Sequence, residues 1–210
     1  MNCLVVVAHP DDEVIWMGGL ILRHPQCEWY VLSLCRADDP DRAPRFHRAA
    51  SELRARAYIS DLDDSPLLTP LSPDLREIKT RIASLVPREF DLVFTHGERG
   101  EYTRHERHEQ AHRAVREMIE SGSLTGQPLY FAYEDCGGTC SPRPAADAQI
   151  RVALTPEEHR AKQHIVHDVY GFGEGSIELD SASPVEAFRA QTDDQAAMLK
   201  TVLENAGAYR

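Results

Sequence analysis

Apolar and polar positions alternate along the chain in a way that predicts strands followed by helices. Residues 3–8 (CLVVVA) form a continuous apolar run rich in β-branched side chains, which is typical of a central strand covered on both faces. Residues 12–23 follow with apolar positions at helical spacing, among them Val14, Ile15 and Ile21. These residues therefore predict a strand–helix unit with a buried strand.

The same pattern recurs over the rest of the chain. Further strands are expected at residues 30–34, 56–61, 91–95, 129–133 and 150–154, the last of these at a sheet edge. Helices are expected at residues 45–56, 75–86 and 105–121, from Pro156 onward, and over 184–203. This order predicts an α/β fold with a Rossmann-like, doubly wound, mostly parallel sheet flanked by helices, in one domain over residues 1–210. Binding sites in such sheets lie at the carboxyl ends of the strands.

The composition is that of an ordinary globular protein and narrows the range of partners. Hydrophobic residues make up 42% of the 210 residues and charged residues 27%, which argues against disorder. The formal net charge is −11 and no basic stripe stands out, so a nucleic acid is not an expected partner. No apolar run reaches the roughly 20 residues that span a bilayer, so no membrane span is expected.

The cysteines and the N-terminal residues predict a cytoplasmic location. The apolar stretch before residue 9 lacks a basic leading segment and runs into acidic residues, so it is interpreted as a strand instead of a signal peptide. The cysteines are odd in number and are expected to be free thiols in a reducing compartment. They are Cys3, Cys27, Cys35, Cys136 and Cys140. The last two could form a metal or redox pair, although their C-x3-C spacing stands alone.

Two polar clusters are expected at the same edge of the sheet. The first, residues 9–13 (HPDDE), follows the first strand, and the second, residues 96–112, follows the strand at 91–95. A histidine and three carboxylates at the end of a buried strand are costly unless a cation offsets their charge, and a divalent metal ion is the simplest such cation. Helix capping by one aspartate is the alternative, but it explains only one of the acids.

The segment AHPDDE at residues 8–13 resembles the signature of the PIG-L/LmbE-like zinc-dependent de-N-acetylases. The resemblance implies that His9 and Asp12 bind zinc and that Asp11 is the general base. It also implies a single LmbE-like deacetylase domain that removes an N-acetyl group, by amide hydrolysis, from a small molecule such as an N-acetylglucosamine conjugate or another sugar conjugate.

A second segment, GEYTRHERH from Gly100 onward, resembles the second motif of this family, in which Gly-Glu-Tyr precedes His-Pro-Asp-His near the start of a helix. The H-x2-H spacing is kept by His105 and His108. The resemblance implies that His108 is the third zinc ligand, that His105 stabilises the tetrahedral intermediate and that Tyr102 helps to polarise the carbonyl. The sequence departs from the family in two ways: Glu-Arg replaces Pro-Asp between the histidines, and one extra residue follows the tyrosine.

A competing motif overlaps the second segment. HEQAH, residues 108–112, satisfies the H-E-x-x-H pattern of zincin metalloproteases, in which His108 and His112 would bind zinc and Glu109 would be the base. Histidines at i and i+4 share a helix face, so the geometry is feasible, but this alternative leaves AHPDDE unexplained. A non-catalytic metal- or sugar-binding module is the third alternative.

Several other residues have less specific interpretations. His96 follows a strand end and is either a pocket residue or an ordinary loop histidine. His164 and His167, on a late helix, are expected on a solvated face. Gly18 and Gly19 are expected to let the first helix pack closely against the sheet.

Taken together, the two clusters predict a metal-dependent hydrolase. With three protein ligands, zinc keeps a position open for water and lowers its pKa from about 15.7 toward about 7. Asp11 would take a proton from this water as it attacks an amide carbonyl, and His105 would contact the oxyanion. Two histidines and one aspartate also accommodate ferrous iron. The pattern identifies neither the sugar nor the oligomeric state, and a homo-oligomer is compatible with it.

Overall fold

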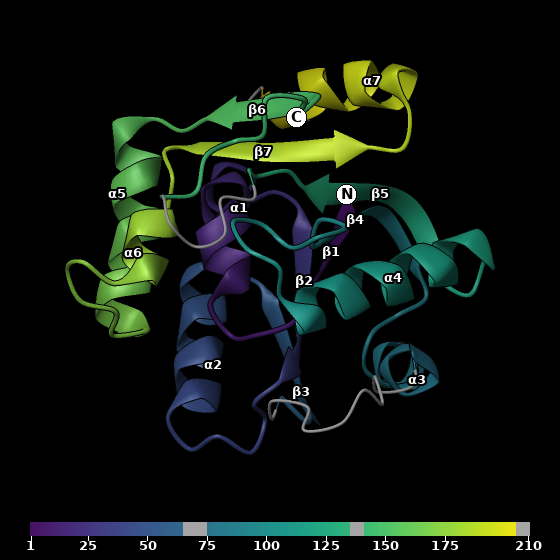
Figure 1. Cartoon of the computed structure of the whole chain (residues 1–210), viewed down its shortest axis with the longest axis horizontal. Helices are drawn as coiled ribbons and strands as arrows, with labels where there is room; N and C mark the ends of the chain where they lie inside the picture. Colours follow the sequence, from purple (N-terminus) through teal and green to yellow (C-terminus); the bar gives the residue numbers. More distant parts are fainter. Residues whose placement is uncertain (65–74, 135–140, 205–210) are drawn as a thin grey trace.

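The centre of the molecule is a single twisted sheet. In the computed structural model, which describes residues 1–64, 75–134 and 141–204, seven strands form this sheet in the order β3-β2-β1-β4-β5-β7-β6 (Figure 1). They are β1 (Asn2–Val7), β2 (Glu28–Cys35), β3 (Arg56–Leu62), β4 (Glu89–Thr95), β5 (Thr125–Phe131), β6 (Ile150–Ala153) and β7 (Val185–Ala190). Strands β1 to β5 pair in parallel, whereas β7 is antiparallel to both β5 and β6. The predicted α/β, mostly parallel sheet is therefore confirmed.

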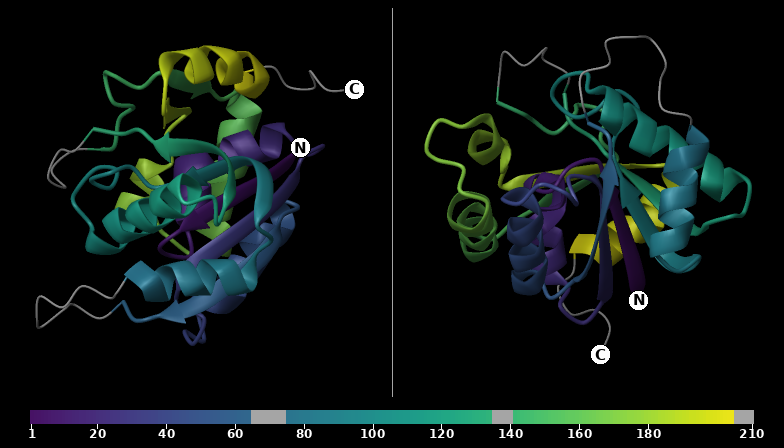
Figure 2. Two further views of the ribbon diagram at one scale, coloured as in Figure 1. Left: turned by 90° about the vertical axis from the view of Figure 1, so that its right-hand side faces the viewer. Right: turned by 90° about the horizontal axis from the view of Figure 1, so that it is seen from below.

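Helices cover both faces of the sheet, which Figure 2 shows between two helical layers. The helices are α1 (Asp12–Arg23), α2 (Arg42–Glu52), α3 (Leu75–Leu85), α4 (Glu106–Glu120), α5 (Pro156–His164), α6 (Ile177–Ser181) and α7 (Asp193–Glu204), with a π-helical turn η1 (Ile165–Val169) directly after α5. Helices α3 and α4 pack on one core, and α1, α2 and α7 pack on the other. In the described part of the chain, no helix is both long and apolar enough to cross a membrane.

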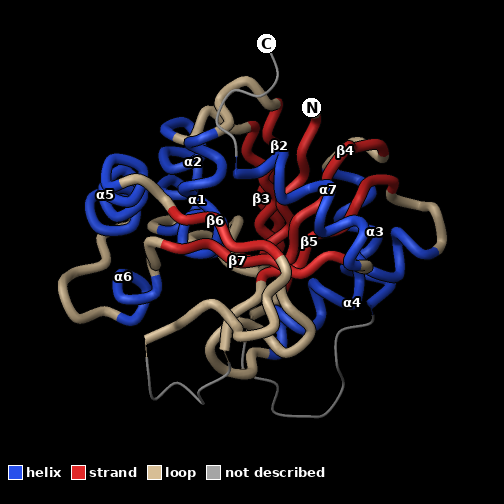
Figure 3. Tube along the Cα trace, turned by 90° about the horizontal axis from the view of Figure 1, so that it is seen from above, coloured by secondary structure: helices blue, strands red, loops and turns tan. Residues whose placement is uncertain are grey.

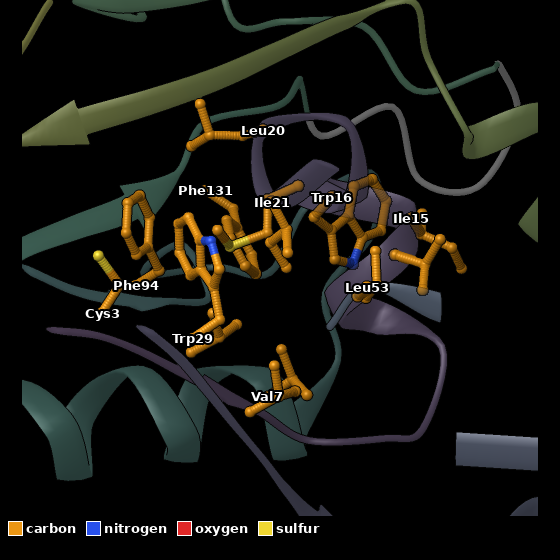
Figure 4. Close-up of a cluster of buried hydrophobic side chains, with 14 of the residues drawn as sticks. Cys3, Val7, Ile15, Trp16, Leu20, Ile21, Trp29, Leu53, Phe94 and Phe131 are labelled. Atoms are coloured by element: carbon orange, nitrogen blue, oxygen red, sulfur yellow. The ribbon is translucent and has the colours of Figure 1, made fainter. Parts of the chain in front are cut away.

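Strand β1 contributes side chains to both cores, as its unbroken apolar run predicts. Its odd-numbered residues, such as Val5, lie in one core, and Leu4 and Val6 lie in the other. Figure 4 shows part of the first core, in which Ile21 of α1 lies among the same group of side chains as Trp29. Burial on both faces places β1 in the middle of the sheet, between β2 and β4.

The predicted helix over residues 184–203 is wrong in its first part. Residues 185–190 form strand β7, which lies beside β6 in Figure 3, and only α7 is helical. The segment VEAFRA is rich in residues that favour helices, but pairing on both sides and burial of Phe188 in the first core decide its conformation. The other predicted elements match to within a few residues, and β6 lies at the sheet edge as expected.

Helix α1 is fixed to β7 by a buried carboxylate. Glu186 accepts hydrogen bonds from the backbone N–H groups of Gly19 (2.8 Å) and Leu20 (2.7 Å), and it pairs with Nζ of Lys162 at 2.8 Å. Gly19 approaches Leu154 so closely that an added Cβ atom would overlap the leucine side chain. The expected close packing of this glycine is therefore present, and it holds the helix that carries the first polar cluster.

Candidate metal centre

The two polar clusters meet at one point of the sheet edge. Val6 of β1 pairs with Thr95 of the neighbouring β4, so the residues after these strands emerge side by side. Helix α1, which follows β1, and helix α4, which follows β4, pack on opposite faces of the sheet. In doubly wound sheets a crevice lies between two such neighbouring strands. A cavity of about 290 Å³ lies there. All six predicted site residues line it: His9, Asp11, Asp12, Tyr102, His105 and His108.

Three side-chain atoms in this cavity have the spacing of metal ligands. Nδ1 of His9 lies 3.4 Å from Oδ2 of Asp12, and Nε2 of His108 lies 3.5 Å from the same oxygen. The two ring nitrogens are 3.3 Å apart. A tetrahedral zinc ion with its usual bond lengths separates neighbouring ligand atoms by about 3.3–3.4 Å. The distances among the three atoms are therefore close to those between ligands of a zinc ion.

The surroundings of His9 favour a positive charge in the cavity. Its Nε2 atom lies 3.0 Å from Oδ1 of Asp64, whose other oxygen accepts a hydrogen bond of 2.7 Å from Arg36. Burial alone would lower the pKa of His9. The neighbouring carboxylates of Asp12 and Asp64 have the larger, opposite effect, so the pKa is raised to about 10. Without a metal ion, His9 is therefore protonated on both nitrogens near pH 7, and metal binding would displace the proton from Nδ1. The remaining proton on Nε2 then faces Asp64, and carboxylates orient metal-binding histidines in this way.

A buried carboxylate orients His108. Glu101 is 1% exposed, and its two oxygens lie 2.5 Å from Nδ1 of His108 and 2.9 Å from Nδ1 of His96. Nε2 of His96 accepts the N–H of Ala8 at 2.9 Å, which places the proton of that ring on Nδ1, facing Glu101. Burial alone would raise the pKa of Glu101. The neighbouring His96 and His108 have the larger, opposite effect, so the pKa is lowered to about 2. Nε2 of His108 is thereby left free to face Asp12.

Asp12 is held by the residues around it. Its Oδ2 atom accepts the N–H of His9 at 2.9 Å, and its Oδ1 atom accepts Nε1–H of Trp16 at 3.0 Å. Burial raises the pKa of Asp12, but His108 and His96 outweigh this effect and hold it well below its ordinary value. The carboxylate is thus ionised and oriented before any ion binds.

Asp11 lines the same cavity as the three ligand residues. Its carboxylate is 14% exposed, and Oδ2 lies 3.4 Å from Nη1 of Arg42. Burial and the neighbouring Asp12 and Glu13 raise the pKa of Asp11 well above its ordinary value. A carboxylate with a raised pKa can accept a proton and release it again, as a general base must.

His105 and Tyr102 border the cavity near its mouth. The ring centroid of His105 lies 4.8 Å from that of His9 and 4.6 Å from that of His108. Partial burial, His108 and His9 lower the pKa of His105 to about 4. The ring is therefore neutral near pH 7 and can donate one hydrogen bond. Tyr102 stands across from Trp16, at a ring-centroid distance of 6.5 Å.

The competing HEQAH motif is not favoured by this geometry. Nδ1 of His112 hydrogen-bonds to the backbone oxygen of His96 at 2.8 Å, and its ring packs on Tyr130. Within residues 1–64, 75–134 and 141–204, three groups of side chains have the spacing to hold a metal ion, and none includes His112; they are His9–His105–His108, His9–Cys35–Asp64 and Asp12–His96–His108. Glu109 instead forms an ion pair with Arg104 at 2.8 Å.

His164 and His167 are not among the described residues that line the cavity. His164 and His167 have side chains 54% and 48% exposed and both contact Asp168, as expected of a solvated face. Cys136 and Cys140 lie outside the described residues.

Two residues of the site, Glu101 and Asp64, were not predicted from the sequence. Glu101 belongs to the Gly-Glu-Tyr segment, so its motif was recognised but no role was assigned to it. Asp64 belongs to no motif, and only its place in an acidic stretch marks it.

We expect Glu101→Gln to weaken metal binding by roughly 10–100-fold, the loss typical when a group that orients a metal ligand is changed. An amide cannot accept hydrogen bonds from both His96 and His108 through two oxygens, so the ring of His108 loses its fixed orientation. Titration of the metal-free protein with Zn²⁺ measures the effect. Unchanged affinity would remove Glu101 from the support of the site.

Comparison with known proteins gives a family match and several structures of the same fold. A family model described as GlcNAc-PI de-N-acetylase (PIG-L) matches residues 4–119, which include both polar clusters. No curated protein matches the chain. The conserved protein TT1542 from Thermus thermophilus is 19% identical, with a TM-score of 0.66, and the match covers 91% of this chain and 94% of that one.

Two further structures show that this fold serves different reactions. GalB, the 4-carboxy-2-hydroxymuconate hydratase from Pseudomonas putida, is 18% identical with a TM-score of 0.60, covering 86% of this chain and 82% of that chain. N,N′-diacetylchitobiose deacetylase from Pyrococcus horikoshii is 17% identical with a TM-score of 0.58, covering 82% and 71%. Identities this low establish a shared fold and no more.

Proposed function

The chain belongs to the GlcNAc-PI de-N-acetylase (PIG-L) family, and on this basis we propose that it is a metal-dependent hydrolase that removes an N-acetyl group from an amino sugar or sugar conjugate. The observation that carries the proposal is the triangle of ligand atoms from His9, Asp12 and His108, with Asp11 in the lining of the same cavity. One carboxylate is thus fixed for a metal ion, and the next is available to move a proton.

In this proposal His9, Asp12 and His108 hold the ion, which is Zn²⁺ or Fe²⁺. A bound ion would supply Lewis-acid chemistry and lower the pKa of a water molecule at the site. Two histidines and one carboxylate leave room for such an additional ligand, as catalytic zinc sites do.

The remaining residues handle the proton and the developing charge. Asp11 takes the proton from the attacking water as its oxygen bonds to the acetyl carbon. His105 and Tyr102 donate hydrogen bonds to the carbonyl oxygen as it becomes negative. Asp11 then passes the proton to the nitrogen as the C–N bond breaks, so that the products are acetate and a primary amine.

The lining of the cavity suits a sugar. The half-buried ring of Tyr102 offers a face against which a pyranose ring can pack, and Arg36, whose side chain is 46% exposed, offers N–H donors for hydroxyl groups. A reducing, cytoplasmic compartment is part of the proposal, because an odd number of cysteines is typical of free thiols, and Cys3, Cys27 and Cys35 form no disulfide within the described residues.

The test is a substrate panel with the metal-loaded protein. We expect N-acetylglucosamine, N,N′-diacetylchitobiose or related conjugates to yield acetate and primary amine in equal amounts. A chelator should abolish the activity, and added Zn²⁺ or Fe²⁺ should restore it.

The panel includes two other classes of substrate, because a fold does not by itself determine a reaction. One is an unsaturated hydroxy-dicarboxylate of the kind that GalB hydrates, and the other is a generic peptide. Turnover of either of these, without amine release from any N-acetyl sugar, would overturn the proposal.

A further inference from the structure

Asp11 has an unusual backbone conformation. Its φ angle is 125°, a region that residues with a Cβ atom rarely adopt. Strained residues of this kind persist only where surrounding contacts hold them, and they concentrate at functional sites. The contacts that hold Asp11 therefore bear on its chemistry.

The backbone of Asp11 is held through Glu13 by a tyrosine from the C-terminal part of the chain. The N–H of Asp11 donates to Oε2 of Glu13 at 3.0 Å, and the hydroxyl of Tyr170 donates to Oε1 of the same carboxylate at 2.5 Å. Glu13 is fully buried and Tyr170 is 3% exposed. The rotation of the Glu13 carboxylate, and with it the acceptor for the strained N–H, is therefore fixed by Tyr170.

The side chain of Asp11 is held through Arg42 by a second aromatic residue of the same segment. Nη1 of Arg42 lies 3.4 Å from Oδ2 of Asp11. The guanidinium of Arg42 also lies over the ring of Phe172, 4.5 Å from its centroid, which is a cation–π distance. Phe172 thus restricts the arginine that faces the carboxylate.

The segment 170–172 is itself packed tightly against α2. It follows the π-helical turn η1, and Arg45 of α2 donates to the backbone oxygen of Val169 at 3.2 Å. Gly171 has a φ angle of +83°, and a Cβ there would lie 2.5 Å from Nη1 of Arg45. Figure 1 shows α5 and α6, which flank this segment, beside α1 and α2. A π-helical turn at such a place is often functional.

We propose that Tyr170 and Phe172 are positioning residues for Asp11, one through Glu13 and the backbone, the other through Arg42 and the carboxylate. Tyr170 fixes the position of the Asp11 backbone, and Phe172 fixes the direction in which the Asp11 carboxylate points within the cavity. The inference rests on the proposed function of Asp11 as the base. Both residues lie outside the part of the chain that the family model matches.

The first experiment compares Tyr170→Phe with Tyr30→Phe. Tyr30 also contacts a glutamate through its hydroxyl, that of Glu28 at 3.3 Å, but it lies in the other core. We expect Tyr170→Phe to lower kcat by roughly 10–100-fold with KM within about twofold, because a small displacement of a catalytic group is that costly. Metal content should match that of Tyr30→Phe, which should keep full activity, and both variants should be folded at the assay temperature; the Tm of Tyr170→Phe should be the lower of the two, because the buried Glu13 loses a donor.

The second aromatic residue is tested with a conservative pair. Phe172→Leu should lower kcat because it removes the π face under Arg42, and Phe172→Tyr should restore most of it. A kcat within about twofold of wild type for both Tyr170→Phe and Phe172→Leu would overturn the proposal. So would a loss of activity that merely follows loss of metal or of folded protein.

A third readout does not depend on the reaction. In the metal-free protein, we expect hydrogen exchange of the Asp11 amide, followed by NMR, to be at least about tenfold faster in Tyr170→Phe than in Tyr30→Phe. Equal exchange rates would overturn the proposal even if the activity falls. If wild-type protein releases no amine from any substrate, the proposed function fails, and the exchange rates still decide whether Tyr170 holds Asp11.

Discussion

Asp11→Asn should lower kcat for N-acetyl hydrolysis by roughly 10²–10⁴-fold, the contribution typical of a positioned general base. Asparagine keeps the size and shape of the side chain but cannot take up a proton. The metal content should stay that of wild type, because Asp11 is not one of the three proposed ligands, His9, Asp12 and His108. Steady-state kinetics on the best N-acetyl sugar, together with metal analysis of the same samples, measure both effects.

The matched control is Glu109→Gln. In the protease alternative Glu109 would be the base, whereas in the structure its carboxylate pairs with Arg104. We expect the rate to change by less than about tenfold, which corresponds to about 1.4 kcal/mol of barrier. A silent Asp11→Asn together with an inactive Glu109→Gln would reverse the assignment and favour the HEQAH motif.

The second large effect is expected for the metal ligands. His108→Ala and Asp12→Ala should each reduce bound metal from about one equivalent per chain to near zero, because two remaining ligands are too few for a stable zinc site. Activity should disappear with the metal. Elemental analysis of the dialysed protein, with circular dichroism as a check on folding, measures the loss.

Helix α4 offers its own control for this experiment. His112 lies one turn after His108, and its ring faces the backbone oxygen of His96 instead of the cavity. His112→Ala should therefore keep its metal. Retention of metal by a folded His108→Ala variant, combined with its loss from His112→Ala, would show that the wrong histidine had been assigned.

The sequence predicts the parts of this protein that depend on local pattern. The run CLVVVA predicts a doubly covered strand, and β1 has that environment because every second side chain enters a different core. That the two polar clusters lie at one edge of the sheet follows from topology, since parallel strands in such sheets have their carboxyl ends at the same edge. The choice of His108 as a ligand came from the resemblance to the family and not from topology.

The contacts that hold the site together could not be predicted in this way. Asp64 reaches His9 across 55 positions of sequence, and Tyr170 reaches Glu13 across 157. Neither belongs to a motif, because each position is set by the path of the chain around the sheet. Strand β7 was misassigned for the same reason: its residues favour a helix, and only pairing with β5 and β6 makes them a strand.

The buried carboxylate of Glu186 limits how far the chain can be shortened from its C-terminal side. The family match ends at residue 119, which invites the excision of a small catalytic module. Such a module would lack the acceptor for the N–H groups of Gly19 and Leu20, in the same helix that begins with Asp12. If residues 4–119 are transferred to another protein scaffold, that scaffold must supply an acceptor in place of Glu186 of β7. The smallest unit that keeps α1 in place therefore includes β7.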